Sequence, residues 1–424
     1  MAETTIGGQP VMAPAPRGVR AVLSSLGPGL ISGASDNDPT TVATLAVIGS
    51  TTGFGLAWLV LLIIPMLVVV QVISAAIGVV CRQGLEDVIR VRYGRGWAYL
   101  ALLVVLAVNV ITLAADLEGG GAALGLLTGK PYQWFILPFA LAVAGLLIWG
   151  SYAALQRVLK YVLLIFLAYV ATAFLARPDW GQVLAHSVVP HFSLSSADYV
   201  AGGLALLGTT LTSYAYVWES IEAAEERAPL PRLGLVQVDA GVGMVFSGLI
   251  FYFILIGTGA TLGVHHTPVQ TAQDAAAALA PLAGKAASLV FGLGLLASAI
   301  IAVPVLAGTS AYVLAEAFDR RGSLDARFRQ ARWFYLALLA SLAAGVAITV
   351  LGVGPIQLLF FGGIAGGLGT PLTLVMMMLA ARDPRVMGAH RVGRGLASGG
   401  WAVTVVVTLA CGLYLWQTFV PGGH

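Results

Sequence analysis

Two aspartates, Asp36 and Asp38, flank Asn37 in the stretch SGASDNDPTTVATL, which interrupts an apolar run over residues 21–62. A charged side chain at membrane depth costs at least about 2.5–3.5 kcal/mol and is kept only where it faces water, protein or an ion. Pro39 lacks a backbone N–H and disfavours helix at Asp38, so the run is predicted to be a broken helix. Carboxylates beside the carbonyls released by such a break form a cation site.

Asp38 also fits a purely structural role, as the N-cap of a second half-helix with Pro39 at its first position. A serine would cap the helix equally well without placing a charge in the membrane. The cap therefore does not account for two carboxylates at this depth, and a site for an ion or substrate is favoured.

A second interruption lies in ALLGTTLTSYAYVWESIEAAEE, where small and hydroxylated residues break the apolar pattern: Gly208, Thr209, Thr210, Thr212, Ser213 and Tyr214. An acidic cluster that includes Glu219 follows, and either a solvated helix end or a site fits Glu219. Transporters built from inverted repeats carry broken helices at matching positions and bind substrate between them near the bilayer midplane. The two interruptions together therefore predict a cation site at their junction.

The composition sets the class of protein that must position these residues. Hydrophobic residues make up 58% of the chain and charged residues only 10%, which excludes a water-soluble globule. The apolar runs are continuous and lack the alternation of a membrane barrel, so the fold class is an all-α integral membrane bundle. At about 20 residues per span, the chain divides into about 11 transmembrane helices. They are expected at residues 20–50, 55–80, 97–127, 133–150, 152–176, 197–222, 235–262, 285–317, 331–353, 355–380 and 398–420.

The positions of the basic residues predict how the chain crosses the membrane. With the N-terminus inside, 19 of the 22 Lys and Arg residues fall on the cytoplasmic side, and only Lys130, Arg177 and Lys285 fall outside. This asymmetry is the one that cytoplasmic loops display. We therefore expect a multi-pass protein of the plasma membrane with a cytoplasmic tail at residues 1–19 and the C-terminus outside.

Around the two interruptions and along much of the chain, the sequence resembles the NRAMP family of divalent-metal transporters. GPGLISGASDNDPTT resembles the family's first-helix block ending in Asp-Pro-Gly-Asn, ITLAADLEGGGAALGLL its third helix, and LGTTLTSYAYVWES its sixth-helix block. Later stretches, LAGTSAYVLAEAF and ARDPRVMG, resemble the eighth helix and the motif after the tenth. The resemblance implies a leucine-transporter-like fold of two inverted repeats, helices 1–5 over residues 20–176 and helices 6–10 over 197–380. Helices 1 and 6 are the broken ones, and an eleventh span over 398–420 follows.

The resemblance also implies roles for individual residues. Asp38 matches the metal-binding aspartate, and Thr41 replaces the asparagine ligand three residues later. Thr209 stands where a backbone carbonyl binds metal, Thr212 where the family has methionine, and Tyr214 where it has the histidine linked to proton movement. Gly119 occupies a position that is usually acidic in the third helix, beside Asp116 and Glu118. The chain is thus a divergent relative whose differences concentrate at the site.

Loss of the methionine removes a soft thioether ligand, and the remaining candidates all offer oxygen. They are Asp38, Asp36, Thr41, Thr209 and Thr212. Hard ions such as Mg²⁺ or Mn²⁺ fit this set, as substrate rather than as a resident cofactor. Methionine-lacking relatives of the family include magnesium transporters, which agrees with the ligand argument.

Proton coupling, as in a symporter, needs a titratable relay, and the six histidines fall in loops or at the C-terminus. Tyr214, Asp116, Glu118, Glu219 and Asp239 are the candidates for coupling or for the pathway. Transport driven by the membrane potential is the alternative, since a divalent ion moving inward gains about 4.6 kcal/mol per 100 mV.

Two functions remain open from the residues. The first is a secondary transporter of divalent metal cations that works by alternating access. The alternative is a cation-coupled carrier of amino acids or another organic solute on the same fold, although Asp36 and Asp38 would repel a carboxylate there. No motif of an enzyme, a cofactor site or a nucleic-acid partner is present, so the expected partners are the metal substrate and the lipid bilayer.

Overall fold

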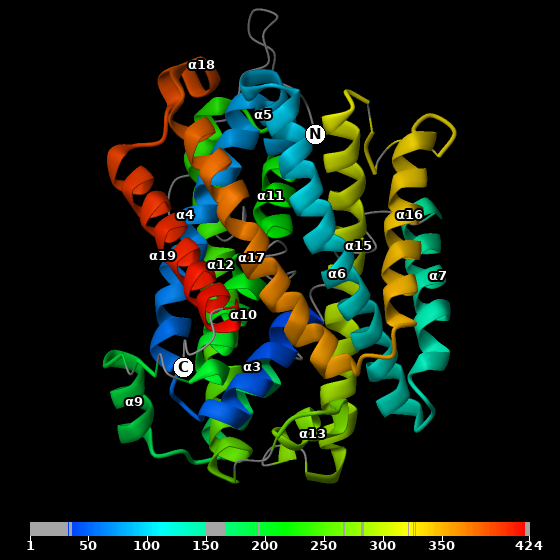
Figure 1. The fold of residues 1–424 in the computed structure, drawn as a ribbon, viewed down its shortest axis with the longest axis vertical. Helices are drawn as coiled ribbons and strands as arrows, with labels where there is room; N and C mark the ends of the chain where they lie inside the picture. Colours follow the sequence, from blue (N-terminus) through cyan, green and yellow to red (C-terminus); the bar gives the residue numbers. More distant parts are fainter. Residues whose placement is uncertain are drawn as a thin grey trace, which may run out of the picture.

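The computed structural model describes residues 33, 36–149, 166–190, 192–193, 196–265, 268–280, 284–320, 322–324, 326 and 328–419. Every regular element in these ranges is a helix, and the long helices run side by side along the long axis of the molecule (Figure 1). The all-α bundle predicted from composition is therefore confirmed. The predicted tail at 1–19, the start of the first span and the first half of the fifth lie outside the described residues.

The helices are best given in chain order. They are α3 (Pro39–Thr52), α4 (Ala57–Cys81), α5 (Leu85–Tyr93), α6 (Arg95–Thr128), α7 (Gln133–Trp149), α9 (Trp180–Val188), α10 (Ala197–Thr210), α11 (Ser213–Glu225), α12 (Leu233–Thr261), α13 (Ala272–Ala277), α15 (Ala287–Ala317), α16 (Arg332–Thr349), α17 (Pro355–Arg382), α18 (Pro384–Met387) and α19 (Arg394–Phe419).

Eight helices of the described part are long and apolar enough to cross a membrane, with α10 and α11 taken as one. The remaining predicted spans coincide with α3, α7 and the helical stretch Phe166–Leu175. The total of about 11 spans stays a prediction, because two of these lie only partly within the described ranges. The short helices α5 and α18 share one end of the bundle, while α9 and α13 share the other (Figure 1).

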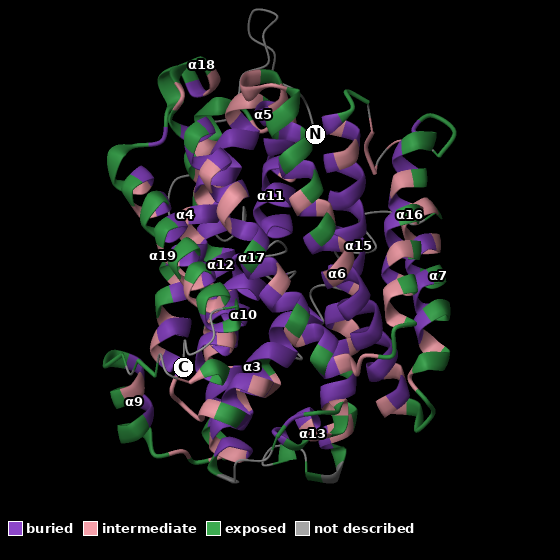
Figure 2. Cartoon of the chain, viewed as in Figure 1, coloured by how far each residue is buried: buried purple, intermediate pink, exposed green. Residues whose placement is uncertain are grey.

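The outer faces of the bundle are apolar, as a lipid environment requires. Large hydrophobic side chains such as Leu103, Leu141 and Leu409 are 67%, 63% and 67% exposed. Figure 2 shows the buried residues concentrated on the inner helices, with the exposed ones along the outer faces of α7, α16 and α19. Polar groups are instead buried inside the bundle, the reverse of a soluble globule.

Both predicted breaks have a local backbone cause. Asp38 has an extended conformation (φ −70°, ψ 166°) and caps α3, whose first residue is Pro39. Thr212 is also extended (φ −64°, ψ 143°), so the chain ends α10 at Thr210 and restarts as α11 at Ser213. In Figure 1, α11 continues the line of α10 along the bundle, and α3 packs beside α10. The two breaks thus face one another inside the bundle.

Glycines let α10 and α17 touch through their backbones. A Cβ atom added to Gly208 would lie 2.0 Å from the carbonyl oxygen of Gly363 and 2.1 Å from the nitrogen of Gly367. No side chain fits in that space. The crossing fixes the end of α10 that leads into the second break.

We predict that Gly208→Ala destabilises the protein, by about 1–3 kcal/mol as overpacked cores do. Gly203→Ala is the matched control in the same helix, because its added Cβ would have only Leu59 Cδ2 at 3.8 Å. Thermal unfolding of the two purified variants in detergent measures the difference. Equal melting temperatures would contradict the backbone contact.

Candidate functional site

Asp38 lies at the point where the two broken helices meet. One carboxylate oxygen, Oδ1, accepts a hydrogen bond from the backbone N–H of Thr41 at 2.6 Å, and Oδ2 accepts one from the Tyr214 hydroxyl at 2.9 Å. The residue is only 1% exposed. The carboxylate therefore caps α3 and also binds the first turn of α11.

Thr41 and Thr209 make the second link between the broken helices. Their hydroxyl oxygens lie 2.8 Å apart, and the Thr41 hydroxyl is 3.4 Å from the Thr209 carbonyl oxygen. Both residues are buried, in the first turn of α3 and the last turn of α10. The structure thus brings three residues singled out in the sequence, Asp38, Thr41 and Thr209, into one hydrogen-bonded group with Tyr214.

Thr212 supplies a further oxygen at the second break. It is the N-cap residue of α11, but its side chain makes no capping hydrogen bond. Its hydroxyl oxygen is buried without a hydrogen-bond partner, as is that of Ser213. These hydroxyls are available to a ligand.

Asp36 is buried two residues before Asp38, at 1% exposure, and neither of its carboxylate oxygens has a hydrogen-bond partner. The intervening Asn37, which the sequence alone did not single out as a site residue, anchors this turn. Its Nδ2 donates to the Ser247 hydroxyl of α12 at 2.9 Å, and its carbonyl accepts from the Ser298 hydroxyl of α15. Nothing in the sequence pairs these positions, which are more than 200 residues apart.

Asp116 approaches the site from α6. Its Oδ1 accepts from the Thr40 backbone N–H at 3.2 Å and from the Thr40 hydroxyl at 2.7 Å, while Oδ2 has no partner. Three residues further along α6, a Cβ atom on Gly119 would come within 2.8 Å of Pro39 Cβ. The glycine at this position therefore makes room for the start of α3.

The other three candidates are not among the hydrogen-bond partners of Asp38, which are Thr41 and Tyr214. Glu118 is buried on α6 with its Oε2 unpartnered, and it acts electrostatically on Tyr132 in the connection between α6 and α7. Glu219 is buried in α11, seven residues beyond the break. Asp239 on α12 acts electrostatically on Glu226. Burial of the Glu226 carboxyl raises its pKa, and the charge of Asp239 raises it further.

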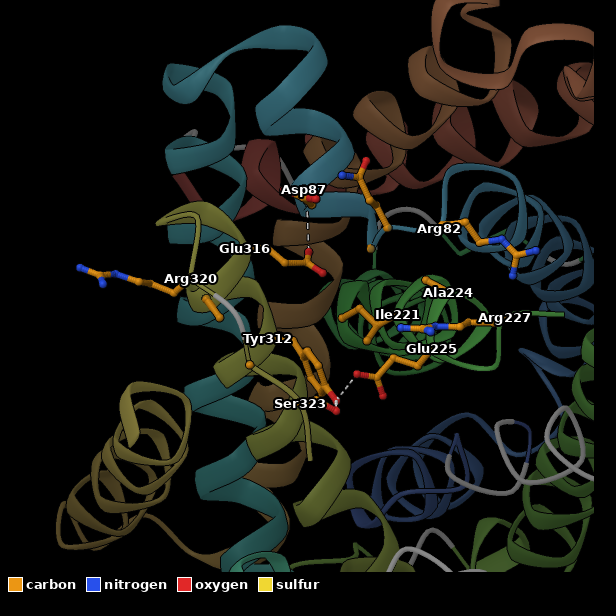
Figure 3. Close-up of a pocket in the computed structure, with 14 residues that line it drawn as sticks. Arg82, Asp87, Ile221, Ala224, Glu225, Arg227, Tyr312, Glu316, Arg320 and Ser323 are labelled. Carbon is orange, nitrogen blue, oxygen red and sulfur yellow. Dashed lines mark hydrogen bonds between the residues drawn. The ribbon is translucent and has the colours of Figure 1, made fainter. Parts of the chain in front are cut away.

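A separate cavity of about 1060 Å³ lies between α5, α11 and α15, at the end of α11 remote from the break. Three acidic residues, one from each of these helices, line it together with three arginines: Asp87, Glu225, Glu316, Arg82, Arg227 and Arg320. Figure 3 shows Tyr312 pointing to Glu225, and the Tyr312 hydroxyl donates a hydrogen bond to Glu225 Oε1 at 2.8 Å. Glu316 Oε2 accepts a hydrogen bond from the backbone N–H of Asp87 at 3.2 Å. Burial, and secondarily the Glu316 charge, raise the pKa of neighbouring Glu86 to about 9.

The chemistry of the site at the breaks is that of oxygen atoms and negative charge. The charged groups that act on Asp36 and Asp116 are carboxylates, and no basic side chain is among them. Within the described residues, no three His, Cys, Asp or Glu side chains converge as a metal-binding group. A cation here would therefore be held by one or two carboxylates together with hydroxyl and carbonyl oxygens, a set that suits hard ions.

Comparison with known proteins agrees with this geometry. The chain is 30% identical to the divalent metal cation transporter MntH of Deinococcus radiodurans over 418 residues, which cover 95% of this chain and 92% of that protein. It is also 30% identical to the protein of that name from Verminephrobacter eiseniae over 387 residues, 88% of this chain and 85% of the relative.

Solved structures share the fold. A manganese transporter from Eremococcus coleocola superposes with a TM-score of 0.75 at 17% identity, covering 96% of this chain and 90% of that one. MhsT in complex with L-phenylalanine gives a TM-score of 0.62 at 15% identity, with coverage of 92% and 98%. At these identities the likeness concerns the fold alone, and it confirms the leucine-transporter-like fold.

The family match covers almost the whole chain. Residues 29–417 match the family described as natural resistance-associated macrophage protein-like. That range contains both helix breaks and Asp116 of α6. The chain therefore belongs to the Nramp family.

Proposed function

We propose that this chain carries divalent metal cations across the membrane by alternating access. The observation that carries the proposal is the position of Asp38, a buried carboxylate bound to both broken helices where they meet. Relatives that align over most of their length are named divalent metal cation transporters, and none of these names describes an enzyme. The metal ion is the substrate, and no resident cofactor is part of the proposal.

The proposed metal-binding set consists of the Asp38 carboxylate, the hydroxyls of Thr41 and Thr212 and the carbonyl of Thr209. Asp36 adds negative charge from the adjacent turn. An arriving ion would replace the hydrogen bonds that now join Asp38, Thr41 and Tyr214, because the same oxygens serve both purposes. With no thioether in the set, Mg²⁺ or Mn²⁺ is preferred over softer ions.

The proposed coupling and pathway residues divide by position. Tyr214 and Asp116 lie next to the site, through Asp38 and Thr40 respectively. We propose that the other three acids line the route to and from the site. Glu118 would lie on the route from the outside, and Glu219 and Asp239 on the opposite side of the break.

We place the protein in the plasma membrane with the N-terminus inside and the C-terminus outside. The end of the bundle that carries α5 and α18 also carries the arginine-rich connections expected in the cytoplasm. Residues 20–176 and 197–380 would form the two inverted-repeat halves, and the predicted span 398–420, which corresponds to α19, would pack outside them.

The organic-solute alternative is not favoured. The likeness to MhsT concerns the fold, and the unpartnered carboxylate of Asp36 would repel an amino-acid carboxylate at this break.

Asp38→Asn is expected to abolish saturable Mn²⁺ and Mg²⁺ uptake by purified protein in liposomes, because the amide removes the charge that compensates the ion. Asp198→Asn, the same change at an exposed position in the first turn of α10, is the control and should transport normally. Size-exclusion chromatography checks that both variants are folded. Uptake at the wild-type rate in Asp38→Asn would refute the site.

Thr212→Met should strengthen competition by Cd²⁺ against Mn²⁺ uptake, because it introduces a soft thioether beside the hard ligands. Thr212→Val removes the hydroxyl without adding sulfur and should leave the order of metal preference as it is. Competition curves for the wild type and the two variants measure the change in metal preference. If Cd²⁺ competes equally against all three, Thr212 is not a ligand.

A further inference from the structure

A smaller cavity, of about 250 Å³, lies between the last two turns of α15 and the first two turns of α16. Its lining is apolar except for Arg320, and it includes Leu314, Phe318, Trp333 and Phe334. Only Ala315 and Arg320 also line the larger cavity between α5, α11 and α15. The metal site at the helix breaks uses none of these residues.

The small cavity has a buried floor and walls that are open to lipid. Phe334 is 1% exposed, whereas Phe318 and Trp333 are 56% and 71% exposed. The Phe334 ring packs against Tyr312 with centroids 4.8 Å apart, and the Phe318 ring packs against Tyr99 of α6 at 5.7 Å. Neighbouring rings therefore fix its shape, and an apolar opening of this kind on the membrane-facing surface suits an acyl chain.

The end of α15 places Arg320 at the polar edge of this cavity. Asp319 has a left-handed backbone with φ 55°, and its N–H bonds to the Glu316 carbonyl at 3.2 Å. The Arg320 N–H bonds to the Ala315 carbonyl at 2.8 Å, which completes a Schellman motif. Arg320 is thus held beside Ala315, and Figure 3 shows its side chain pointing away from Glu225.

The charge around Arg320 is positive. Residues 319–332, which connect α15 to α16, include five arginines and two aspartates, and one of these, Asp319, is paired with Arg90 at 3.0 Å. Within the described ranges, Arg320 takes part in no ion pair. A free guanidinium beside an apolar cavity at the end of two membrane helices complements a phosphate group above an acyl chain.

We infer that this cavity binds one anionic phospholipid of the phosphatidylglycerol type, from the leaflet that we place on the cytoplasmic side. Its phosphate lies on the Arg320 guanidinium, and one acyl chain lies between Phe318, Trp333 and Phe334. The aliphatic stem of Arg320 covers part of the apolar wall, as long basic side chains do at the membrane boundary. This site goes beyond the proposed transport function and does not depend on it.

Native mass spectrometry of the full chain in detergent, titrated with phosphatidylglycerol or with phosphatidylcholine of the same acyl chains, tests the inference. One phosphatidylglycerol should bind at a lower concentration than phosphatidylcholine. Arg320→Gln should weaken its binding about fivefold, the effect of one basic residue at an anionic surface. Arg394→Gln, the same change at the first residue of α19, is the control and should bind as the wild type does.

Two further changes locate the acyl chain. Bromine atoms on an acyl chain quench tryptophan fluorescence on contact, so brominated phosphatidylglycerol should quench the wild type more than brominated phosphatidylcholine does. Trp333→Phe should remove this excess, whereas Trp401→Phe on α19 should retain it. Ala337→Phe fills the cavity and should weaken binding of phosphatidylglycerol in the mass spectrometric titration.

The contrary outcomes are distinct. Equal binding of the two lipids, or binding of phosphatidylglycerol that neither Arg320→Gln nor Ala337→Phe weakens, overturns the site. Release of the lipid by inorganic phosphate would show that the phosphate group alone is the ligand, and a lipid-free dimer would assign this surface to a second copy of the chain. Absence of Mn²⁺ and Mg²⁺ uptake in liposomes overturns the proposed function and leaves the lipid site standing.

Discussion

The Asp38 carboxylate joins the two broken helices, and the rest of the site depends on it. With one oxygen it satisfies a free N–H at the start of α3, and with the other it accepts the Tyr214 hydroxyl from α11. Backbone groups exposed by a break in a membrane helix have no water to bind, so the break survives only where side chains or ions satisfy them. The carboxylate that makes the break tolerable is therefore also the one best placed to bind a cation.

Close backbone packing holds this junction in place. Gly208 lies against Gly363 and Gly367 of α17, and Gly119 of α6 lies against Pro39. Without a hydrophobic driving force between helices in lipid, small residues allow the close contacts that stabilise association. Two of the elements that end or begin at a break are thus positioned by glycines on neighbouring helices, which ties the geometry of the site to the packing of the bundle.

The differences that the resemblance implies would replace soft or basic ligands at the site by oxygen atoms. By the resemblance, Thr212 and Tyr214 offer hydroxyls where the family has a thioether and an imidazole, and Asp36 is proposed to add a second carboxylate. By the same resemblance Gly119 stands at a usually acidic position of α6, whereas Asp116 nearby accepts a hydrogen bond from Thr40. We propose that a site offering oxygen atoms and no thioether favours hard ions.

The amino-acid sequence by itself determined the membrane class, the position of most spans and both breaks. These features are local: apolar length, a proline after an aspartate and a run of threonines each act through their own backbone. It also indicated Asp38, Thr41 and Thr209, which the structure brings together, because they stand at the breaks themselves. Most of the spans it predicted coincide with single helices, although α5 and α9 were not foreseen, being too short to follow from hydropathy.

Only the tertiary structure decided which distant groups meet at the breaks. Asp116 binds Thr40 across 76 residues, and Asn37 binds Ser247 and Ser298 across 210 and 261. Glu118, Glu219 and Asp239 were equally good candidates as isolated acids, yet none of them is a hydrogen-bond partner of Asp38. The periodicity of apolar residues predicts the face of the helix on which a side chain lies. Which neighbouring helix meets that face depends on how the helices cross, and therefore on packing over the whole bundle.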